Sequence, residues 1–230
     1  MRRRINMDSP RRLEEIFAHF PGIGPRQARR FVYYLMNKPP AFIKEFVQLI
    51  EEVKKSTSEC EMCHKFFTNT SGSSRDKSKT LICGICSDQN RDQTILMIVA
   101  RDSDFESIEK SGAYKGLYFI LGGSVPVLDK EPEKRIRLKS LLERISSDIS
   151  KNSKSISAAD GQSPRFQEII LSLNTTPDGE HTATIVRDAI SNITAGKQIK
   201  ITILGRGLST GAELEYADSD TIRNALKNRA

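Results

Sequence analysis

The chain has 230 residues, of which 37% are hydrophobic, and its net charge is +7 because Lys and Arg outnumber Asp and Glu by 36 to 29. This length suits one or two domains, and the low hydrophobic content predicts several small cores in place of one large core. The basic balance favours a polyanionic partner. The sequence has no apolar run of membrane-spanning length and no hydrophobic stretch typical of a signal peptide. We therefore predict a cytoplasmic protein that does not contact membranes.

The positive charge is concentrated at the start of the chain. Residues 1–30 contain eight arginines and three acidic residues, and so carry +5 of the total charge. Such asymmetry indicates a nucleic-acid arm or a contact with an anionic membrane surface, and this segment is too polar to insert into a membrane.

Helical periodicity dominates the first sixty residues. Apolar residues recur at helical spacing over 10–19 and 26–36, and a third helix is predicted from 42 to about 53. The sequence PGIGP joins the first two helices. These elements predict a small helical domain at the start of the chain.

The loop and the helix that follows it, FPGIGPRQARR at 20–30, combine glycines with three arginines. Glycine permits backbone conformations that side chains forbid, and a helix starting at a proline presents amides to an anion. Guanidinium groups in the first turns strengthen the same anion site, which reads phosphates and not bases. The alternative is a tight turn beside a solvated basic face. The candidate DNA-binding residues are Gly22, Gly24, Arg26, Arg29 and Arg30.

Four cysteines form two C-x2-C pairs separated by nineteen residues, at Cys60, Cys63, Cys83 and Cys86. This spacing is typical of a zinc ribbon, in which four thiolates close a tetrahedral, structural site for one Zn²⁺ ion. Four unligated thiols and a redox-active pair are the alternatives. We expect His64, beside the first pair, to be an ordinary exposed histidine.

Short apolar runs and helix-like segments alternate after the cysteines. The runs lie at 95–100, 116–121, 168–173 and 199–204, and helices are expected at 103–111, 132–145 and 180–191. Unbroken apolar runs are typical of buried parallel strands, and their alternation with helices predicts βαβ units. Two polar stretches, 69–79 and 146–164, are expected to be surface insertions.

The whole chain resembles the RecR family of bacterial recombination mediators. Residues 20–24 match the core of a helix-hairpin-helix motif, and the cysteine pairs follow it. IVARDSDFESIEKSGAYKGLYFILGGSVPVLD at 98–129 resembles the Toprim segment of that family, NTTPDGEHTAT its Asn-Thr-Pro segment and GRGLSTGAELEYADSDTIRNAL its C-terminal signature. Two departures are the wider spacing of the cysteine pairs and the polar stretch at 146–164.

The resemblance implies a multi-part α+β fold whose α/β Toprim domain has a mostly parallel sheet. The predicted parts are a helix-hairpin-helix domain at 1–58, a four-cysteine zinc finger at 59–90, a Toprim-like domain at 91–204 and a C-terminal segment at 205–230.

A non-enzymatic role in DNA repair follows from the same resemblance. The family implies a homodimer or a ring-shaped homotetramer that binds single- and double-stranded DNA without sequence preference. It also implies RecO and RecF family proteins as partners in loading recombinase onto single strands. Arg26 and Arg30 match the family's basic DNA-contacting positions.

One departure bears on enzyme chemistry. Toprim enzymes hold Mg²⁺ with a glutamate after the first strand and an Asp-x-Asp pair after the third, but Ala100 and the segment 173–176 occupy these positions here. Asp102 and Asp104 are a possible replacement pair. The alternatives are therefore a magnesium-dependent Toprim enzyme, primase-like or a nuclease, and a zinc-ribbon adaptor that binds only protein.

Overall fold

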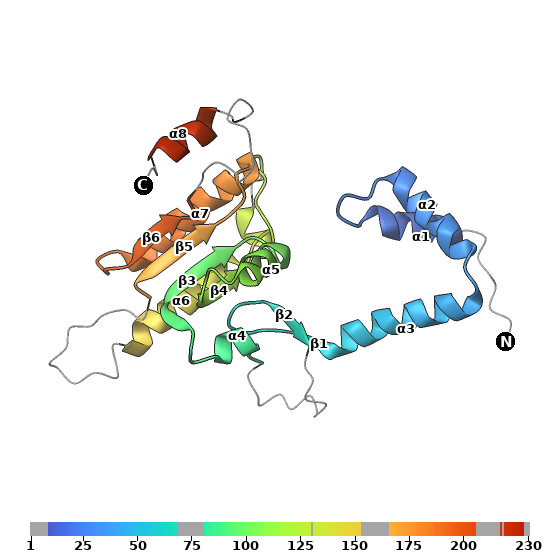
Figure 1. Ribbon diagram of the computed structural model, residues 1–230, viewed down its shortest axis with the longest axis horizontal. Helices are drawn as coiled ribbons and strands as arrows, with labels where there is room; N and C mark the ends of the chain where they lie inside the picture. The colour runs from blue at the N-terminus through green and yellow to red at the C-terminus, as the bar shows by residue number, and fades with distance from the viewer. Residues whose placement is uncertain are drawn as a thin grey trace. The chain divides into compact units, whose positions relative to one another are not determined.

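A computed structural model of the chain describes residues 9–68, 81–129, 131–152, 166–205, 217 and 219–227. The chain divides into two compact units, Met1–Thr57 and Ser58–Ala230 (Figure 1). Each unit is described by itself below.

The first unit is helical. It contains α1 (Ser9–Ala18), α2 (Pro25–Met36) and α3 (Pro40–Ser56), which confirms the three predicted helices. Proline begins α2 and α3, where its missing N–H is not needed by the helix. The ring of Phe17 on α1 contacts Phe20 and Phe31, with ring centroids 5.6 and 5.7 Å apart, and these contacts hold the α1–α2 hairpin together.

The second unit begins with the segment that carries the cysteines. The strands β1 (Thr57–Glu59) and β2 (Phe66–Thr68) form a two-stranded sheet on either side of the first cysteine pair. The short helix α4 (Gly84–Ser87) carries the last cysteine. This small sheet was not predicted, because three-residue strands have no recognisable periodicity.

A four-stranded parallel sheet forms the centre of the second unit. Its strands are β3 (Asp92–Val99), β4 (Gly116–Ile120), β5 (Glu168–Ser172) and β6 (Lys200–Ile203), in the order β4-β3-β5-β6. All three pairings are parallel, and Met97 of β3 lies opposite Tyr118 of β4 and Ile170 of β5. The apolar runs thus mark the positions of all four strands and the predicted α/β class is confirmed, but the run at 199–204 is not buried as predicted, because β6 lies at the edge of the sheet and none of its residues is buried.

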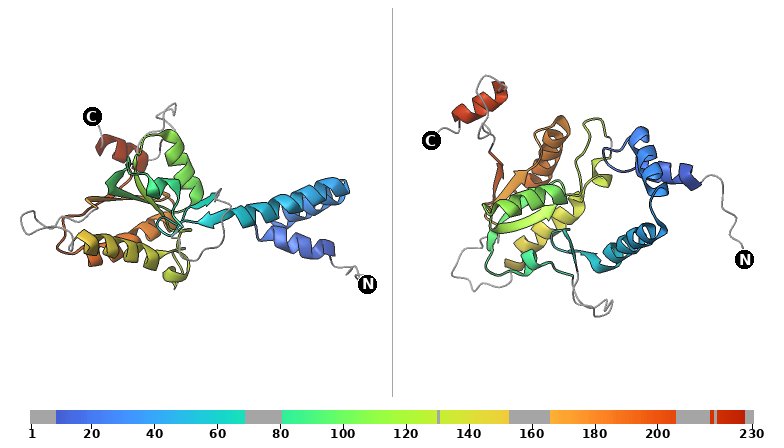
Figure 2. Two further views of the ribbon diagram at one scale, coloured as in Figure 1. Left: turned by 90° about the horizontal axis from the view of Figure 1, so that it is seen from below. Right: turned by 45° about the vertical axis from the view of Figure 1, so that its right-hand side comes forward.

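Helices cover both faces of this sheet (Figure 2). The helices α6 (Leu138–Asn152) and α7 (Pro177–Thr194) pack on the face that includes Leu96 and Phe119, whereas α5 (Asp102–Ser111) packs on the face that includes Met97 and Tyr118. Alternate residues of each strand point to opposite faces, so one apolar run supplies two cores. The helix α8 (Ser219–Lys227) lies in the C-terminal segment.

The structure corrects one predicted helix. A 3-10 turn, η1 (Pro132–Lys134), precedes α6, which begins at Leu138 and continues to Asn152. Seven residues assigned to the polar insertion 146–164 therefore belong to a helix, and Asp148 among them is buried. The rest of that stretch, and the stretch at 69–79, lie outside the described residues. Within the described ranges, no helix has both the length and the apolar composition needed to span a membrane.

Candidate metal centre and nucleic-acid interface

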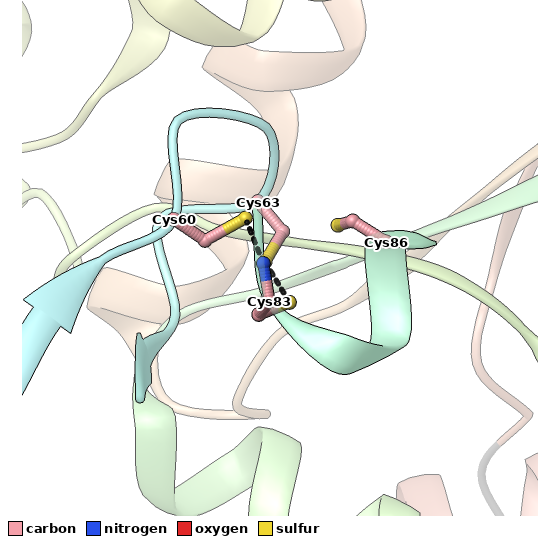
Figure 3. A group of neighbouring side chains, drawn as sticks. All are labelled: Cys60, Cys63, Cys83 and Cys86. Atoms are coloured by element: carbon pink, nitrogen blue, oxygen red, sulfur yellow. Dashed lines mark hydrogen bonds between the residues drawn. The ribbon is translucent and has the colours of Figure 1, made fainter. Parts of the chain in front are cut away.

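The two cysteine pairs face one another (Figure 3), and their four sulfur atoms all lie within 4.8 Å of each other. In a tetrahedral site with Zn–S bonds of about 2.3 Å the sulfurs are about 3.8 Å apart. Here the Sγ atoms of Cys63 and Cys83 are 3.5 Å apart. Three of the cysteines are buried and Cys86 is half-buried. The four residues thus fit a closed site for one thiophilic metal ion.

The backbone around the cysteines prepares this geometry. The N–H of Cys60 donates to the carbonyl of Lys65 and the N–H of His64 donates to the carbonyl of Cys60, both over 2.9 Å, which closes the first turn. His64 adopts a left-handed φ of 62° in this turn. The N–H of Cys83 donates to the Sγ of Cys60 over 3.3 Å. Amide donors of this kind stabilise negative charge on a thiolate.

The four thiols are close enough to shift one another's pKa. Hydrogen bonds, first from Cys63 and then from Cys83, lower the pKa of the Cys60 thiol. The pKa of Cys63 and that of Cys86 are raised, in each case chiefly by the hydrogen bond with Cys60. Metal ligands must be thiolates, so a bound cation would displace the protons that these thiols share.

The prediction that His64 is an ordinary exposed histidine is wrong. Its side chain is only 19% exposed, and its Nδ1 lies 2.7 Å from the Oε1 of Glu59. The imidazole also packs edge-on against Phe119 of the sheet, with centroids 5.1 Å apart. His64 therefore supports the first cysteine turn from outside and is not one of the clustered ligands.

The first cysteine turn is fastened to the parallel sheet. The N–H of Ile120 on β4 donates to the carbonyl of Cys63 over 2.9 Å. The guanidinium of Arg144, a residue that is 8% exposed, donates to the carbonyls of Met62 and Tyr118 over 2.6 and 2.7 Å. Arg144 was missed from sequence because a single arginine in an amphipathic helix is usually solvated.

The loop between α1 and α2 contains the two glycines that are candidates for DNA binding. Gly22 has a left-handed φ of 76°, which glycine accepts without strain. The N–H of Gly24 donates to the Oε1 of Gln27 over 3.2 Å. The Gln27 side chain thus caps the start of α2 at this amide.

All three candidate arginines of α2 are exposed. The Nε of Arg29 lies 3.5 Å from the Oε2 of Glu14 on α1, so part of its charge is neutralised. Arg26 and Arg30 have no ion pair with any residue in the range 9–57. Two guanidinium groups are thus available to an anion on the outer face of the hairpin.

The two aspartates that follow β3 have other roles. Asp104 accepts the N–H of Arg101 over 3.0 Å at the start of α5, and Asp102 accepts the N–H of Phe66 over 3.4 Å. Ala100, at the position of the Toprim glutamate, is fully buried. In the part of the chain that the structure describes, the four cysteines are the only group of three or more candidate ligands close enough to hold one ion.

Comparison with known proteins identifies the family. Residues 94–205 match the model of the Toprim domain, and residues 207–230 match the model named RecR, C-terminal. The recombination protein RecR of Lactobacillus helveticus is 33% identical over 94% of this chain and 94% of its own length. The chain belongs to the RecR family.

Two further RecR proteins show the same extent of similarity. That of Bifidobacterium animalis subsp. lactis is 35% identical over 95% of this chain and 94% of its own length, and that of Staphylococcus aureus is 31% identical over the same shares. The RecR match therefore covers the helical unit and the cysteine cluster as well as the Toprim sheet.

Proposed function

We propose that this RecR family chain is a non-enzymatic protein of recombinational DNA repair that binds single- and double-stranded DNA through the phosphate backbone. The observation that carries the proposal is the outer face of α2, where Arg26 and Arg30 are exposed and have no acidic partner within residues 9–57. Charge-assisted hydrogen bonds from guanidinium to phosphate are strong and independent of base identity. The similar proteins are recombination proteins by name.

The proposed metal is one structural Zn²⁺ ion held by Cys60, Cys63, Cys83 and Cys86. Four thiolates leave no coordination position open for substrate or water, so such a centre stabilises the fold and does not catalyse. Support comes from the burial of the cluster and from its spacing.

Self-association, as a homodimer or a homotetrameric ring, is also proposed. It is supported by α3, which has no buried residue although it carries an apolar stripe at positions i, i+3, i+4 and i+7. The stripe consists of Phe46, Leu49, Ile50 and Val53, all exposed. A continuous apolar helix face of this kind is typical of a contact with another chain.

The remaining parts of the proposal rest on the family. RecO and RecF family proteins are the proposed partners in loading recombinase onto single strands, and the cytoplasm is the proposed location. The proposed parts of the chain are 1–58 for DNA binding, 59–90 for the zinc finger, 91–204 for the Toprim-like scaffold and 205–230 for the C-terminal segment.

The DNA-binding proposal is tested with the double variant Arg26→Ala/Arg30→Ala. Its affinity should fall to a similar extent for several unrelated DNA sequences, measured by fluorescence anisotropy at one salt concentration. The matched control is Lys54→Ala/Lys55→Ala, which removes the same charge from the last turn of α3. Equal losses in both double variants, or no loss in the arginine variant, would count against the hairpin as the contact.

The non-enzymatic assignment has a separate test. Purified protein is incubated with supercoiled, nicked and single-stranded DNA, with and without Mg²⁺, and no metal-dependent product is expected. A product that Asp104→Ala abolishes would instead support the magnesium-dependent enzyme. Failure to retain DNA at moderate salt would favour an adaptor that binds only protein.

A further inference from the structure

The exposed face of α2 carries an aromatic ring in line with its free arginines. Tyr33 follows Arg26 by seven residues and Arg30 by three, a spacing that puts all three side chains on one side of a helix. Ala28 and Val32 occupy the opposite, buried side. Tyr33 is 57% exposed. A basic helix face thus ends in a solvent-facing phenol ring.

The neighbouring exposed aromatics differ from Tyr33 because their rings are already in contact with other side chains. Tyr34, 52% exposed, meets Phe42 edge-on, and the Nζ of Lys38 lies 4.3 Å from its ring centroid. The rings of Phe20 and Phe31 both pack against Phe17. Within residues 9–57, no aromatic ring or cation contacts the ring of Tyr33. The exposed part of this ring is therefore available to a ligand.

The backbone of Tyr33 is held in place at the end of α2, whereas its ring has no aromatic or cationic partner within residues 9–57. Its backbone carbonyl accepts both the N–H and the Nδ2 of Asn37, over 3.2 and 2.8 Å, at the C-terminal end of α2. Only the side-chain torsions remain to be ordered when a ligand binds. An exposed aromatic ring beside positive charge is the arrangement on which single-stranded nucleic acids stack their bases, and stacking tolerates any sequence.

We propose that Tyr33 stacks on an unpaired nucleobase while Arg26 and Arg30 hold the adjoining phosphates. In a duplex the faces of the bases are covered by their neighbours, so only single-stranded DNA gains this contact. The inference rests on the proposed DNA-binding function and adds a residue that selects single strands. The free arginines beside the ring favour a polyanion over an apolar protein surface.

The test compares three ligands of the same length by fluorescence anisotropy with the full chain: an oligothymidylate, a strand of abasic sites and a mixed-sequence duplex. The variants are Tyr33→Leu, which keeps apolar bulk but removes the ring, and Tyr33→Phe, which keeps the ring. Tyr34→Leu is the matched control because its neighbouring ring is already covered.

Tyr33→Leu should weaken binding of the oligothymidylate by about fivefold or more, the loss expected for one base–aromatic stack. Its binding of the abasic strand and of the duplex should stay at the wild-type level, as should all binding by Tyr33→Phe and Tyr34→Leu. An equal loss for all three ligands, or no loss for any, would overturn the inference. A particle mass of Tyr33→Leu that differs from the wild type in solution would also overturn the inference, because it would assign Tyr33 to a contact between copies of the chain.

The proposed DNA-binding function fails in a different pattern. If Arg26→Ala/Arg30→Ala binds every ligand as the wild type does, the hairpin is not the DNA contact. If that variant loses binding while Tyr33→Leu does not, the hairpin binds phosphates and only the stacking role is wrong.

Discussion

The two units of this chain use their apolar residues in opposite ways. In the second unit they form two cores on the faces of the parallel sheet, and the strand residues Leu96, Ile98 and Phe119 are fully buried. Among residues 9–57, the described part of the first unit, only Ala28 and Val32 are buried. The same unit exposes large apolar residues on all three helices and in the loop between α1 and α2: Ile16, Phe20, Phe31, Tyr33, Tyr34, Met36, Phe46, Val47, Leu49, Ile50 and Val53.

This difference predicts that the second unit determines the stability of the protein and that the first unit determines its binding to other molecules. The sheet unit holds its own structure through buried surface, hydrogen bonds from β4 and Arg144, and the cysteine cluster. The helical unit exposes the guanidinium groups of Arg26 and Arg30 and the apolar stripe of α3, so both can bind other molecules. Substitutions in the second unit should therefore change stability, and substitutions in the first should change binding.

The largest effect is expected from loss of the metal centre. Cys60→Ser should release the bound ion and lower the temperature of unfolding, because metal binding in such clusters stabilises the fold by about 10–16 kcal/mol in isolated zinc-finger peptides. Metal analysis and thermal unfolding by circular dichroism measure both changes. Treatment of the wild-type protein with a chelator should also remove the ion and lower the temperature of unfolding. A variant with full metal content and unchanged stability would refute the ligand assignment.

A pair of leucine truncations tests the comparison directly. Leu141→Ala on α6 removes a fully buried side chain and should lower the free energy of unfolding by about 2–5 kcal/mol. Leu49→Ala makes the same chemical change on α3, where the leucine is 52% exposed, and should cost less than about 0.5 kcal/mol in dilute protein. Urea denaturation measures both. Equal losses would show that the first unit also depends on a packed core.

A smaller effect is expected at Arg144. Arg144→Met keeps the apolar length but leaves the carbonyls of Met62 and Tyr118 without this donor, at a cost of about 1–3 kcal/mol. The variant should also release metal to a chelator faster, because the turn between Cys60 and Cys63 loses an anchor. Lys139→Met on the exposed side of α6 is the control. Unchanged metal release in Arg144→Met would show that the anchor does not support the cluster.

The smallest effect on folding is expected on the apolar stripe of α3. Ile50→Glu places a charge on an exposed position and should change unfolding of dilute protein by no more than about 0.5 kcal/mol. Its particle mass, measured by sedimentation at higher concentration, should fall if the stripe joins copies of the chain. Gln48→Glu, at an exposed position of the same helix outside the stripe, adds the same single negative charge and should leave the mass unchanged. An unaltered mass in Ile50→Glu would show that the stripe does not form the contact between copies of the chain.

Much of the fold was predictable because its signals are local. Unbroken apolar runs located all four parallel strands, and helical periodicity located α1, α2 and α3. The pairing of two C-x2-C motifs located the cluster, since cysteine spacing restricts the geometry directly. These features do not depend on which distant residues happen to meet.

The errors concern residues whose environment is set by distant parts of the chain. His64 is covered because Phe119 of the sheet lies against it, and Arg144 is buried because it reaches the carbonyl of Met62. Asp148 is buried on α6, although it lies in a stretch that its polar composition predicts to be a surface insertion.

The salt dependence of DNA binding tests the central claim most directly. For the wild type, the logarithm of the duplex binding constant should fall linearly with the logarithm of the salt concentration. The slope of Arg26→Ala/Arg30→Ala should be shallower by about 1.8, which corresponds to two lost phosphate contacts. An identical slope in wild type and variant would contradict the account, because it would mean that these arginines displace no counterions from DNA.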